Sequence, residues 1–447
     1  MILRFRNLGI IEKADINISK PFIVFTGPNG TGKTYLSYVL SELPNSFGGF
    51  FMALARKEEE KEKLKSIFDP SLLKNDSILE GALDPDALYD LFQRAVKAIS
   101  KSLLTVLNLK DENNGFKIEI LSSKEAWRKE LLDMKLDCGY FLHLEKKPGT
   151  YSFTATDLKD ARERMDNARD DVFEFALFMN SVFMSGSSAT TMFTAERSGI
   201  TLFSKEISVG RLKDSNPRVP RYPRPISLAL ADAEDRAYHR KHMSLYADLA
   251  DEIENYIIKG QIEVSSEGEL LLNEDGNKLD LALSSSSIKA LAELVFYIRH
   301  RALKMSKLIV DEPELNLHPD NQLIISRVFA KMVNRGLSLI VSTHSDYIIR
   351  ELNNLIMLSG LPDGSDEKLS QWGYSTDMEL HFDRVAAYLF SYNSRGKVEV
   401  KPVLVTETGF KASTIDETIS RQNEISQAIY YELRYGKERK IKSSIDA

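Results

Sequence analysis

Residues 27–34 have the composition and spacing of a phosphate-binding loop. They follow an apolar run at 22–25 and precede a helical pattern at 35–40. Glycines allow torsions that point several backbone N–H groups inward, and the start of the helix adds partial positive charge. Lys33 can reach the outer phosphates of a nucleotide, and the Thr34 hydroxyl can ligate Mg²⁺. We therefore expect nucleotide contacts from Gly27, Pro28, Asn29, Gly30, Thr31, Gly32, Lys33 and Thr34.

Two carboxylates end a second apolar run, which covers residues 307–310. An aspartate at the end of a buried parallel strand is typical of the group that helps hold Mg²⁺ beside a P-loop nucleotide, so Asp311 takes that role. Side chains alternate along a strand, so Glu312 points differently and can address the water that attacks the γ-phosphate. We expect Glu312 to be the general base.

A histidine follows a third apolar run, at residues 339–341. Ligands of open α/β sheets bind at the carboxyl ends of the strands, which is where His344 lies in this pattern. We expect His344 to act in catalysis, through contact with the γ-phosphate or the attacking water.

Four consecutive serines precede a helical pattern whose apolar face includes Ile288, Leu291, Val295 and Ile298. Serines at a helix N-terminus can be simple N-caps, but free N–H groups, hydroxyls and the helix dipole together also form an anion site. Because the cluster precedes the two carboxylates and the histidine along the chain, we expect it to contact the nucleotide through Ser284, Ser285, Ser286 and Ser287.

These motifs require a sheet whose strand ends meet, so the sequence predicts an α/β P-loop fold with a mainly helical insertion. We expect the start of the core at residues 1–50 and the insertion at 51–190, which has helical stripes at 88–103 and 158–184. A helix from about 226 to 258 and a hairpin around Glu267 and Gly268 fall within the next segment, residues 191–280. Core elements resume at 281–360, and strands and a helix at 416–433 follow at 361–447, before a frayed basic tail.

The insertion closes with a strand pattern followed by a predicted turn, which contains the adjacent residues Glu196 and Arg197. They either face the nucleotide or form an ion pair with each other, and the ion pair is favoured.

The composition describes a globular chain of 447 residues with a net charge of −6. This charge argues against a global positive field for nucleic acid, so DNA binding would have to be local, at 211–224 or 434–442. One cysteine excludes an internal disulfide and a cysteine-rich zinc site. Because no apolar run approaches the roughly 20 residues of a membrane span and residues 1–6 do not read as a signal peptide, we expect a cytoplasmic protein.

The order of P-loop, serine signature, Asp311–Glu312 strand and Ser342–Thr343–His344 resembles the ATP-binding-cassette class of ATPases. Within that class the chain is similar to the soluble RecF, chromosome-maintenance and OLD branch, especially to stand-alone ATPases of bacterial anti-phage systems. The resemblance covers residues 1–45 and about 280–355. It departs from the transporter pattern in its Leu-Ser-Ser-Ser-Ser signature, and no glutamine loop can be assigned.

The resemblance implies an ATPase that uses Mg²⁺ and forms a head-to-tail homodimer or a larger assembly of such dimers. In this class the serines of one subunit cover the γ-phosphate held by the P-loop of another. It also implies a separate effector protein, controlled by the ATP-dependent dimer, as in defence systems. No membrane partner is implied.

Two alternatives stay open. One is a RecF-like DNA-repair ATPase, for which DNA would be the partner. The other is an OLD-type nuclease, whose C-terminal Toprim domain binds metal through a glutamate and an Asp-x-Asp pair. Residues 403–409, which include Glu407, faintly resemble the opening strand of that domain, but no Asp-x-Asp follows them.

Overall fold

The computed structural model describes residues 1–57, 59–60, 81–82, 85–106, 115–133, 136–137, 143–144, 152–153, 189–212, 222–362, 364–411 and 413–445. The predicted helical stripe at 158–184 lies outside these residues. So does most of the proline-rich connection at 211–224.

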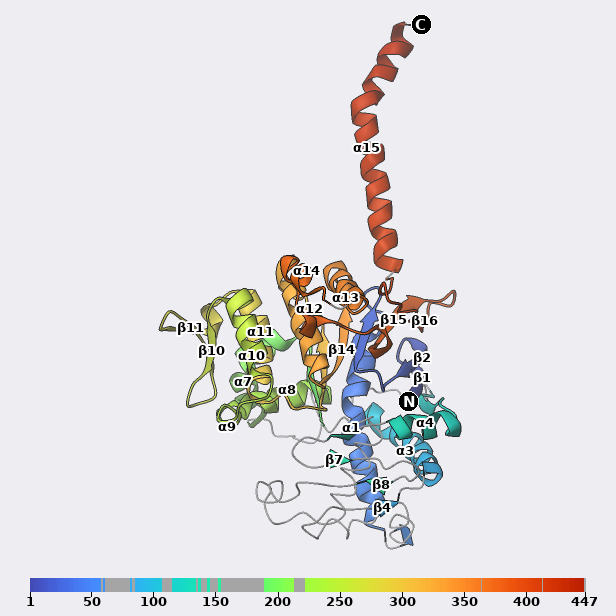
Figure 1. The fold of residues 1–447 in the computed structure, drawn as a ribbon, viewed down its shortest axis with the longest axis vertical. Coiled ribbons are helices and arrows are strands. Elements are labelled where there is room, and N and C mark those ends of the chain that lie inside the picture. The colour runs from blue at the N-terminus through green and yellow to red at the C-terminus, as the bar shows by residue number, and fades with distance from the viewer. Residues whose placement is uncertain are drawn as a thin grey trace.

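A nine-stranded sheet forms the centre of the structure, in the order β5-β1-β2-β16-β15-β3-β14-β13-β9 (Figure 1). Strands β15, β3, β14, β13 and β9 run parallel to one another, whereas β5, β1 and β2 form an antiparallel edge. Strand β16 joins the two parts, because it is parallel to β2 and antiparallel to β15. The α/β prediction is confirmed. The strands are β1 (Ile2–Leu8), β2 (Ile11–Asn17), β3 (Phe22–Thr26), β5 (Lys117–Ile120), β9 (Thr190–Phe193), β13 (Lys307–Asp311), β14 (Ser338–Thr343), β15 (Val385–Tyr392) and β16 (Val398–Val403).

Helices cover both faces of the sheet because its central strands are apolar on both sides. In β3, Ile23 and Phe25 pack with α1 and α3, while Phe22 and Val24 pack on the opposite face. The first face is covered by α1 (Lys33–Ala55) and α3 (Pro85–Val106), and the second by α10 (Ala247–Ile253), α11 (Ser286–His300), α12 (Pro319–Asn334) and α13 (Asp346–Leu358).

The segment that we predicted to be a helical insertion, residues 51–190, contributes to the main sheet as well as to the helical layer, which includes its helix α3. Its strand β5 pairs with β1, so part of the insertion belongs to the sheet that holds the P-loop. Its other described elements are α4 (Lys124–Asp133) and two short pairs of strands, β4 (Gly81–Ala82) with β8 (Ser152–Phe153) and β6 (Leu136–Asp137) with β7 (His143–Leu144).

The segment after β9 differs from the sequence prediction in two places. A helix, rather than a turn, begins at Arg197, and the single helix expected at 226–258 is divided into several. The hairpin is confirmed, because Ile262 pairs with Leu272 and Val264 with Leu270. The elements are α7 (Arg197–Leu212), α8 (Arg224–Glu234), α9 (Arg236–His239), a π-helical turn (Glu254–Ile258), β10 (Gln261–Val264), β11 (Leu270–Glu274), β12 (Asn277–Asp280) and a 3₁₀ turn (Leu281–Leu283).

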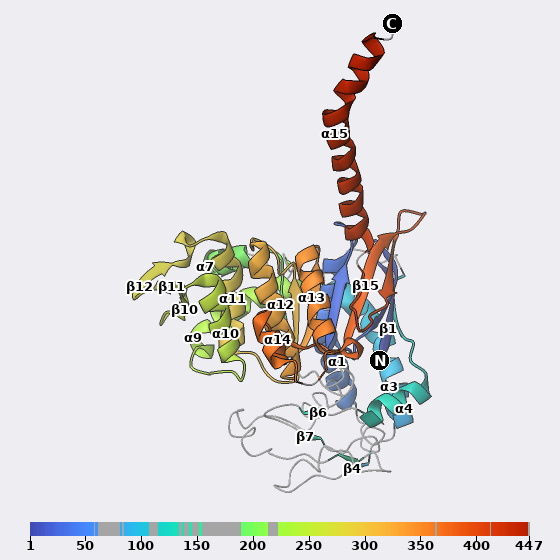
Figure 2. The ribbon, with the colours of Figure 1, turned by 45° about the horizontal axis from the view of Figure 1, so that its top comes forward.

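The chain ends in helix α15 (Ser413–Ile445), which extends away from the rest of the described structure in two views (Figures 1 and 2). The helix includes the basic tail that we expected to be frayed, so that prediction was wrong for residues 434–445. Between α13 and α15 lie α14 (Asp366–Gln371), two 3₁₀ turns (Thr376–Met378 and Phe382–Arg384) and the strands β15 and β16.

Candidate nucleotide site

Three neighbouring strands end together at one edge of the sheet. Strand β14 lies between β3 and β13, and its register pairs Thr343 with Thr26 and Ser342 with Asp311. The P-loop follows β3, Glu312 follows β13 and His344 follows β14. The apolar runs of the sequence thus bring together the loop, both carboxylates and the histidine, as their positions at strand ends predict.

The loop needs glycine at its first position. A Cβ on Gly27 would lie 2.3 Å from the carbonyl oxygen of Phe390, and its φ of +137° is one that L-residues rarely adopt. This close approach lets the chain turn directly from β3 toward α1. Helix α1 then begins at Lys33, with Gly32 as its N-cap in the left-handed conformation.

Lys33 is nearly buried and folds back over the loop. Its Nζ donates to the carbonyl oxygens of Gly27 (3.0 Å) and Pro28 (2.8 Å). Burial lowers the pKa of Lys33 to about 8, although the nearby carboxylates of Asp311 and Glu312 oppose that shift. A cation with so little water around it gains strongly from an anionic ligand.

Asp311 is bonded to two hydroxyls. Thr34 donates to its Oδ2 (2.8 Å), and Ser342 donates to its Oδ1. Burial raises the pKa of Asp311, whereas both hydroxyl hydrogen bonds lower it. A carboxylate and a hydroxyl that meet beside a phosphate loop are oxygen ligands of the kind that Mg²⁺ prefers. The residues therefore fit the predicted ion, with Thr34 and Asp311 as the groups that would hold it.

Glu312 has an unusual backbone conformation. Its φ of +50° lies in the left-handed region, which is sparsely populated by residues other than glycine. Its N–H donates to the Ser342 carbonyl (2.9 Å). Burial and the neighbouring charge of Asp311 raise the pKa of the Glu312 carboxyl. Because of this positive φ, the backbone at Glu312 departs from the regular strand alternation that we assumed, and a raised pKa suits a base.

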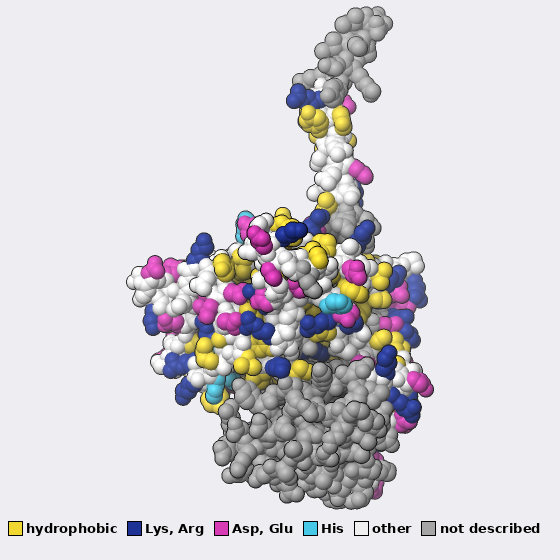
Figure 3. Space-filling view, viewed as in Figure 1, with side chains coloured by type: hydrophobic (Ala, Val, Ile, Leu, Met, Phe, Trp, Pro, Cys, Tyr) yellow, Lys and Arg dark blue, Asp and Glu magenta, His cyan; other side chains and the backbone are white. Residues whose placement is uncertain are grey.

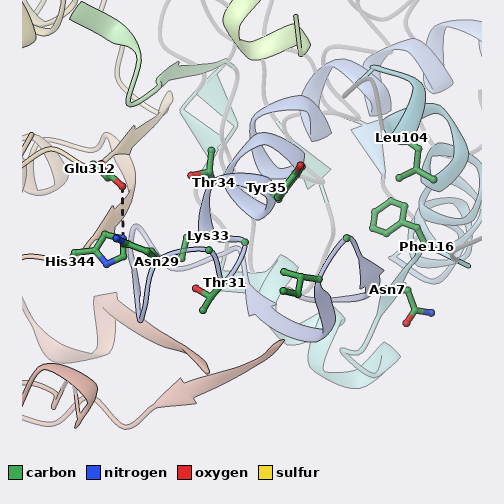
Figure 4. A pocket seen from close by; sticks show the side chains of 14 residues that line it. Asn7, Asn29, Thr31, Lys33, Thr34, Tyr35, Leu104, Phe116, Glu312 and His344 are labelled. Atoms are coloured by element: carbon green, nitrogen blue, oxygen red, sulfur yellow. Dashed lines mark ion pairs between the residues drawn. The ribbon is translucent and has the colours of Figure 1, made fainter. Parts of the chain in front are cut away.

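The His344 Nε2 lies 3.8 Å from the Glu312 Oε1, the contact drawn as a dashed line in Figure 4. Burial and the positive charge of Lys33 lower the pKa of His344 to about 4. The imidazole is therefore neutral near neutral pH, and the contact is not an ion pair under those conditions. The backbone N–H of His344 donates to the Glu314 Oε1 (2.7 Å), so Glu314 holds the main chain at this position.

One cavity of roughly 690 Å³ collects the loop and the catalytic candidates. Glu312 and His344 line one end of the cavity, beside Asn29 and Lys33, whereas the opposite end is lined by Leu104 and Phe116 (Figure 4). The two ends of the cavity match the two ends of a nucleotide. Its phosphates are charged, and its base is a flat ring whose faces can pack against apolar side chains. We did not predict the apolar end from the sequence; it is lined by Leu104, on α3, and by Phe116, immediately before β5.

The four serines lie at the exposed tip of α11. Ser285 is its N-cap and accepts from the Ile288 N–H (3.3 Å), and Ser285 Oγ lies 2.8 Å from Ser287 Oγ. Ser284 donates to the Leu281 carbonyl (2.7 Å). None of the serines lines the cavity around the P-loop of the same chain. The adjacent Leu283 is 79% exposed, so this tip presents both hydroxyls and an apolar side chain to solvent.

Arg197 has contacts that differ from our interpretation of the sequence. Its guanidinium is buried and donates to the carbonyl oxygens of Ala290 (3.0 Å), Asp311 (2.8 Å) and Glu312 (2.9 Å). The described residues contain no ion pair between Arg197 and Glu196, which is exposed. Arg197 instead connects the serine helix α11 to the turn that carries the two carboxylates.

Among the residues that the structure covers, no group of three or more His, Cys, Asp or Glu side chains is placed to hold a metal. None of the helices in those ranges combines the length and hydrophobicity of a membrane span. Glu407 is exposed, in the turn that leads to α15.

Comparison with known families gives one match. An AAA ATPase domain family, AAA_15, matches residues 228–349, which include the serine helix, the Asp311–Glu312 strand and His344, but not the P-loop. No curated protein matches the chain. The match supports ATPase activity, and it agrees with the convergence of the P-loop, Glu312 and His344 on one cavity.

Two solved structures are similar to the chain at low identity. One is a SmcHead bound to the C-winged helix domain of ScpA, with 11% identity, a TM-score of 0.38, and coverage of 91% of this chain and 98% of that chain. The other is the SMC head domain from Thermotoga maritima, with 13% identity, a TM-score of 0.31, and coverage of 90% and 98%. Both scores are below 0.5, so neither similarity defines the function of this chain.

Proposed function

We propose that ATP binding closes two copies of this chain head to tail, and that the resulting dimer controls a separate effector protein in bacterial anti-phage defence. The observation that carries the proposal is the separation within one chain of the P-loop cavity from the exposed serine tip of α11. Each chain would bind the triphosphate through its loop and leave its serines for the nucleotide of the other chain.

The cavity residues would divide the chemistry among them. Lys33 and the loop N–H groups would bind the phosphates, and Glu312 would take a proton from the attacking water. His344, which is neutral, would donate a hydrogen bond to, or accept one from, the groups around the γ-phosphate. Held by Thr34 and Asp311, Mg²⁺ would supply charge that stabilises the phosphates.

The second subunit would complete the site electrostatically. One face of the triphosphate meets Lys33, and the other needs donors, which the N–H groups and hydroxyls of Ser285, Ser286 and Ser287 would provide from the partner. ATP would thus hold the two chains together. Hydrolysis removes the bridging phosphate and with it the preference for the closed pair.

A pair of variants tests this mechanism by mass measurement in solution with and without ATP and Mg²⁺. We expect Glu312→Gln to bind ATP, to lose turnover and to accumulate as the closed dimer. Lys33→Ala is the matched control and should lose ATP binding and ATP-dependent dimerisation. Full-rate hydrolysis by Glu312→Gln would contradict the general-base assignment, and unchanged ATP affinity in Lys33→Ala would contradict the P-loop assignment.

The defence role has its own test, in host cells that carry the gene with its neighbours. We expect phage to form fewer plaques on cells that carry the wild-type gene than on cells that carry the empty vector. Glu312→Gln and Lys33→Ala should each abolish this protection. Equal plaque numbers in wild-type and vector cells would reject the defence role. ATP-dependent, salt-sensitive DNA binding would instead favour the DNA-repair alternative, and metal-dependent cutting by the purified chain would favour a nuclease. The same proposal places the protein in the cytoplasm.

A further inference from the structure

Helix α15 has no apolar face covered by the described chain. From residue 418 to 434, every side chain except that of Ile419 is exposed, and the helix points away from the sheet and its helices (Figures 1 and 2). Long helices in proteins gain most of their stability from the packing of one face. A helix of 33 residues, about 50 Å long at 1.5 Å per residue, therefore needs a partner.

One face of α15 carries large apolar side chains at a spacing of four residues. Ile425, Ile429 and Leu433 are 52%, 56% and 71% exposed. Figure 3 shows hydrophobic side chains, in yellow, grouped near the upper limit of the coloured part of this helix. Residues four apart lie on the same side of a helix, so the three side chains form a continuous stripe that could pack against another helix.

The two parts of α15 have opposite charge. Residues 413–433 contain four acidic side chains and one basic, a net charge of −3, and residues 434–445 contain five basic and one acidic, a net charge of +4. Helix-dipole effects favour acidic residues in the first turn and basic residues in the last. They do not explain Glu424, Glu432 and Arg434, which are far from both ends.

We propose that α15 pairs antiparallel with α15 of a second copy of this chain. Parallel pairing would place −3 beside −3 and +4 beside +4, whereas antiparallel pairing places each acidic part beside a basic part. The centre of residues 413–445 is Ile429, since (413 + 445)/2 = 429. A two-fold axis there brings Ile429 opposite Ile429 of the second copy and Ile425 opposite Leu433, because each pair of numbers sums to 858.

The base of α15 is fixed to the ATPase body. Asn353, on α13, donates to the Phe410 carbonyl (2.8 Å) and accepts from the Phe410 N–H (2.9 Å), and Phe410 is buried. Antiparallel pairing puts the two bases at opposite ends of the helix pair. The two bodies then lie about 50 Å apart, too far to enclose ATP between them. If the proposed ATP-dependent dimer also forms, the α15 pair would link two such dimers.

The first test measures the mass of the full chain without nucleotide, by sedimentation and light scattering. We expect a dimer of the wild type, and a monomer or at least about a tenfold weaker dimer for Ile429→Ser/Leu433→Ser. Tyr431→Ser is the control, because Tyr431 is similarly exposed but lies on the opposite side of α15 from Ile429. A wild-type monomer, or equal weakening by the control, would overturn the proposal, as would small-angle scattering that shows α15 folded onto its own body.

A pair of introduced charges tests the antiparallel register. We expect Ile425→Glu and Leu433→Lys each to weaken the nucleotide-free dimer. The double variant should recover much of the lost affinity, because residue 425 of each copy then faces the opposite charge at residue 433 of the other. Failure of the double variant to restore affinity would overturn the register and favour a parallel pair or a different partner protein. Circular dichroism of each variant monitors the helix itself.

A final measurement separates this inference from the proposed function. In the Glu312→Gln background with ATP and Mg²⁺, we expect assemblies of four chains or more, and Ile429→Ser/Leu433→Ser should reduce them to dimers. If the nucleotide-free dimer forms but ATP adds no chains, α15 pairing is supported and ATP-dependent dimerisation is contradicted. If the nucleotide-free chain is a monomer and ATP converts it to a dimer, ATP-dependent dimerisation is supported and α15 pairing is contradicted.

Discussion

The guanidinium of Arg197 donates a hydrogen bond of 2.9 Å to the backbone carbonyl of Glu312. Glu312 has a φ of +50°, a conformation that costs a residue with a Cβ about 1–2 kcal/mol. The bond to Arg197, and a second one to the carbonyl of Asp311, help to hold this turn in place. The direction of the base candidate thus depends on a side chain 115 residues away in the sequence.

Replacement of Arg197 by Met should reduce turnover more than ATP binding. The substitution leaves four carbonyl oxygens, those of Thr194, Ala290, Asp311 and Glu312, without their charged donor. Each lost bond costs about 1.5–3 kcal/mol, and part of this loss disturbs the geometry of Glu312. We expect kcat to fall about tenfold or more, with little change in ATP affinity, measured by steady-state hydrolysis and equilibrium binding.

Arg236→Met is a matched control for stability. Arg236 is also buried and also bonds to α11, through Glu293, but it does not contact the catalytic turn. We expect this variant to unfold at lower urea concentration while its folded fraction keeps normal kcat. An equal fall of kcat in both variants would show that Arg197 acts only through general stability.

ATP affinity should depend on the charge of Lys33. Its pKa is lowered to about 8 in the free protein, so Lys33 is charged below that pH and loses its proton as pH rises through it. We expect ATP affinity to decrease above about pH 8 in titrations with a fluorescent ATP analogue. Lys33→Arg should remove this dependence from whatever binding it retains, because arginine stays protonated. Affinity that stays constant at alkaline pH in the wild type would contradict the prediction.

The positions of the catalytic candidates could be predicted because each follows an apolar run. Such runs form buried parallel strands, and the carboxyl ends of neighbouring parallel strands meet at one edge. From this geometry we predicted that Asp311 and His344 lie beside the P-loop. It also would have found Arg197, which follows β9, the parallel neighbour of β13. We considered Arg197 only together with its sequence neighbour Glu196, and we therefore predicted an ion pair between them that the structure does not contain.

Other features depend on long-range packing that no local pattern contains. Phe116 reaches the nucleotide cavity because the short strand β5 pairs with β1, more than a hundred residues earlier. The left-handed turn at Glu312 is not encoded by a glycine. The helical tail at 434–445 was missed because its sequence is rich in charge, which is typical of solvated ends.

The serines can be separated by their structural roles. Ser285→Ala removes the N-cap of α11 and should cost about 1 kcal/mol of stability, whereas Ser286→Ala/Ser287→Ala leaves that cap in place. In the Glu312→Gln background we expect the double variant to weaken ATP-dependent dimerisation, as measured by sedimentation. Dimerisation at wild-type strength would mean that these serines only shape the helix end.

Gly409 should be intolerant of a side chain. A Cβ there would lie 2.2 Å from the Asn353 Oδ1, and its φ is +91°. We expect Gly409→Ala to break the Asn353–Phe410 hydrogen bonds and to destabilise the base of α15 by about 1–3 kcal/mol, measured by hydrogen exchange. Gly396→Ala is the control, because its φ of +70° is also positive but no atom lies within 4 Å of the added methyl. If both variants are destabilised equally, the loss of stability comes from the positive φ alone and not from the contact with Asn353.

His344 should act as a neutral group. The pKa of His344 is lowered to about 4. The pH dependence of kcat should therefore show no step from His344 near 6.5, the ordinary pKa of histidine. The acid limb should instead come from Glu312, which must lose its proton to act as a base and whose pKa is raised above 4.5. We expect His344→Gln, which keeps a neutral hydrogen-bonding side chain, to retain about tenfold more activity than His344→Ala. A step near 6.5 in the wild type that disappears in His344→Gln would show that the charged imidazole takes part in the reaction.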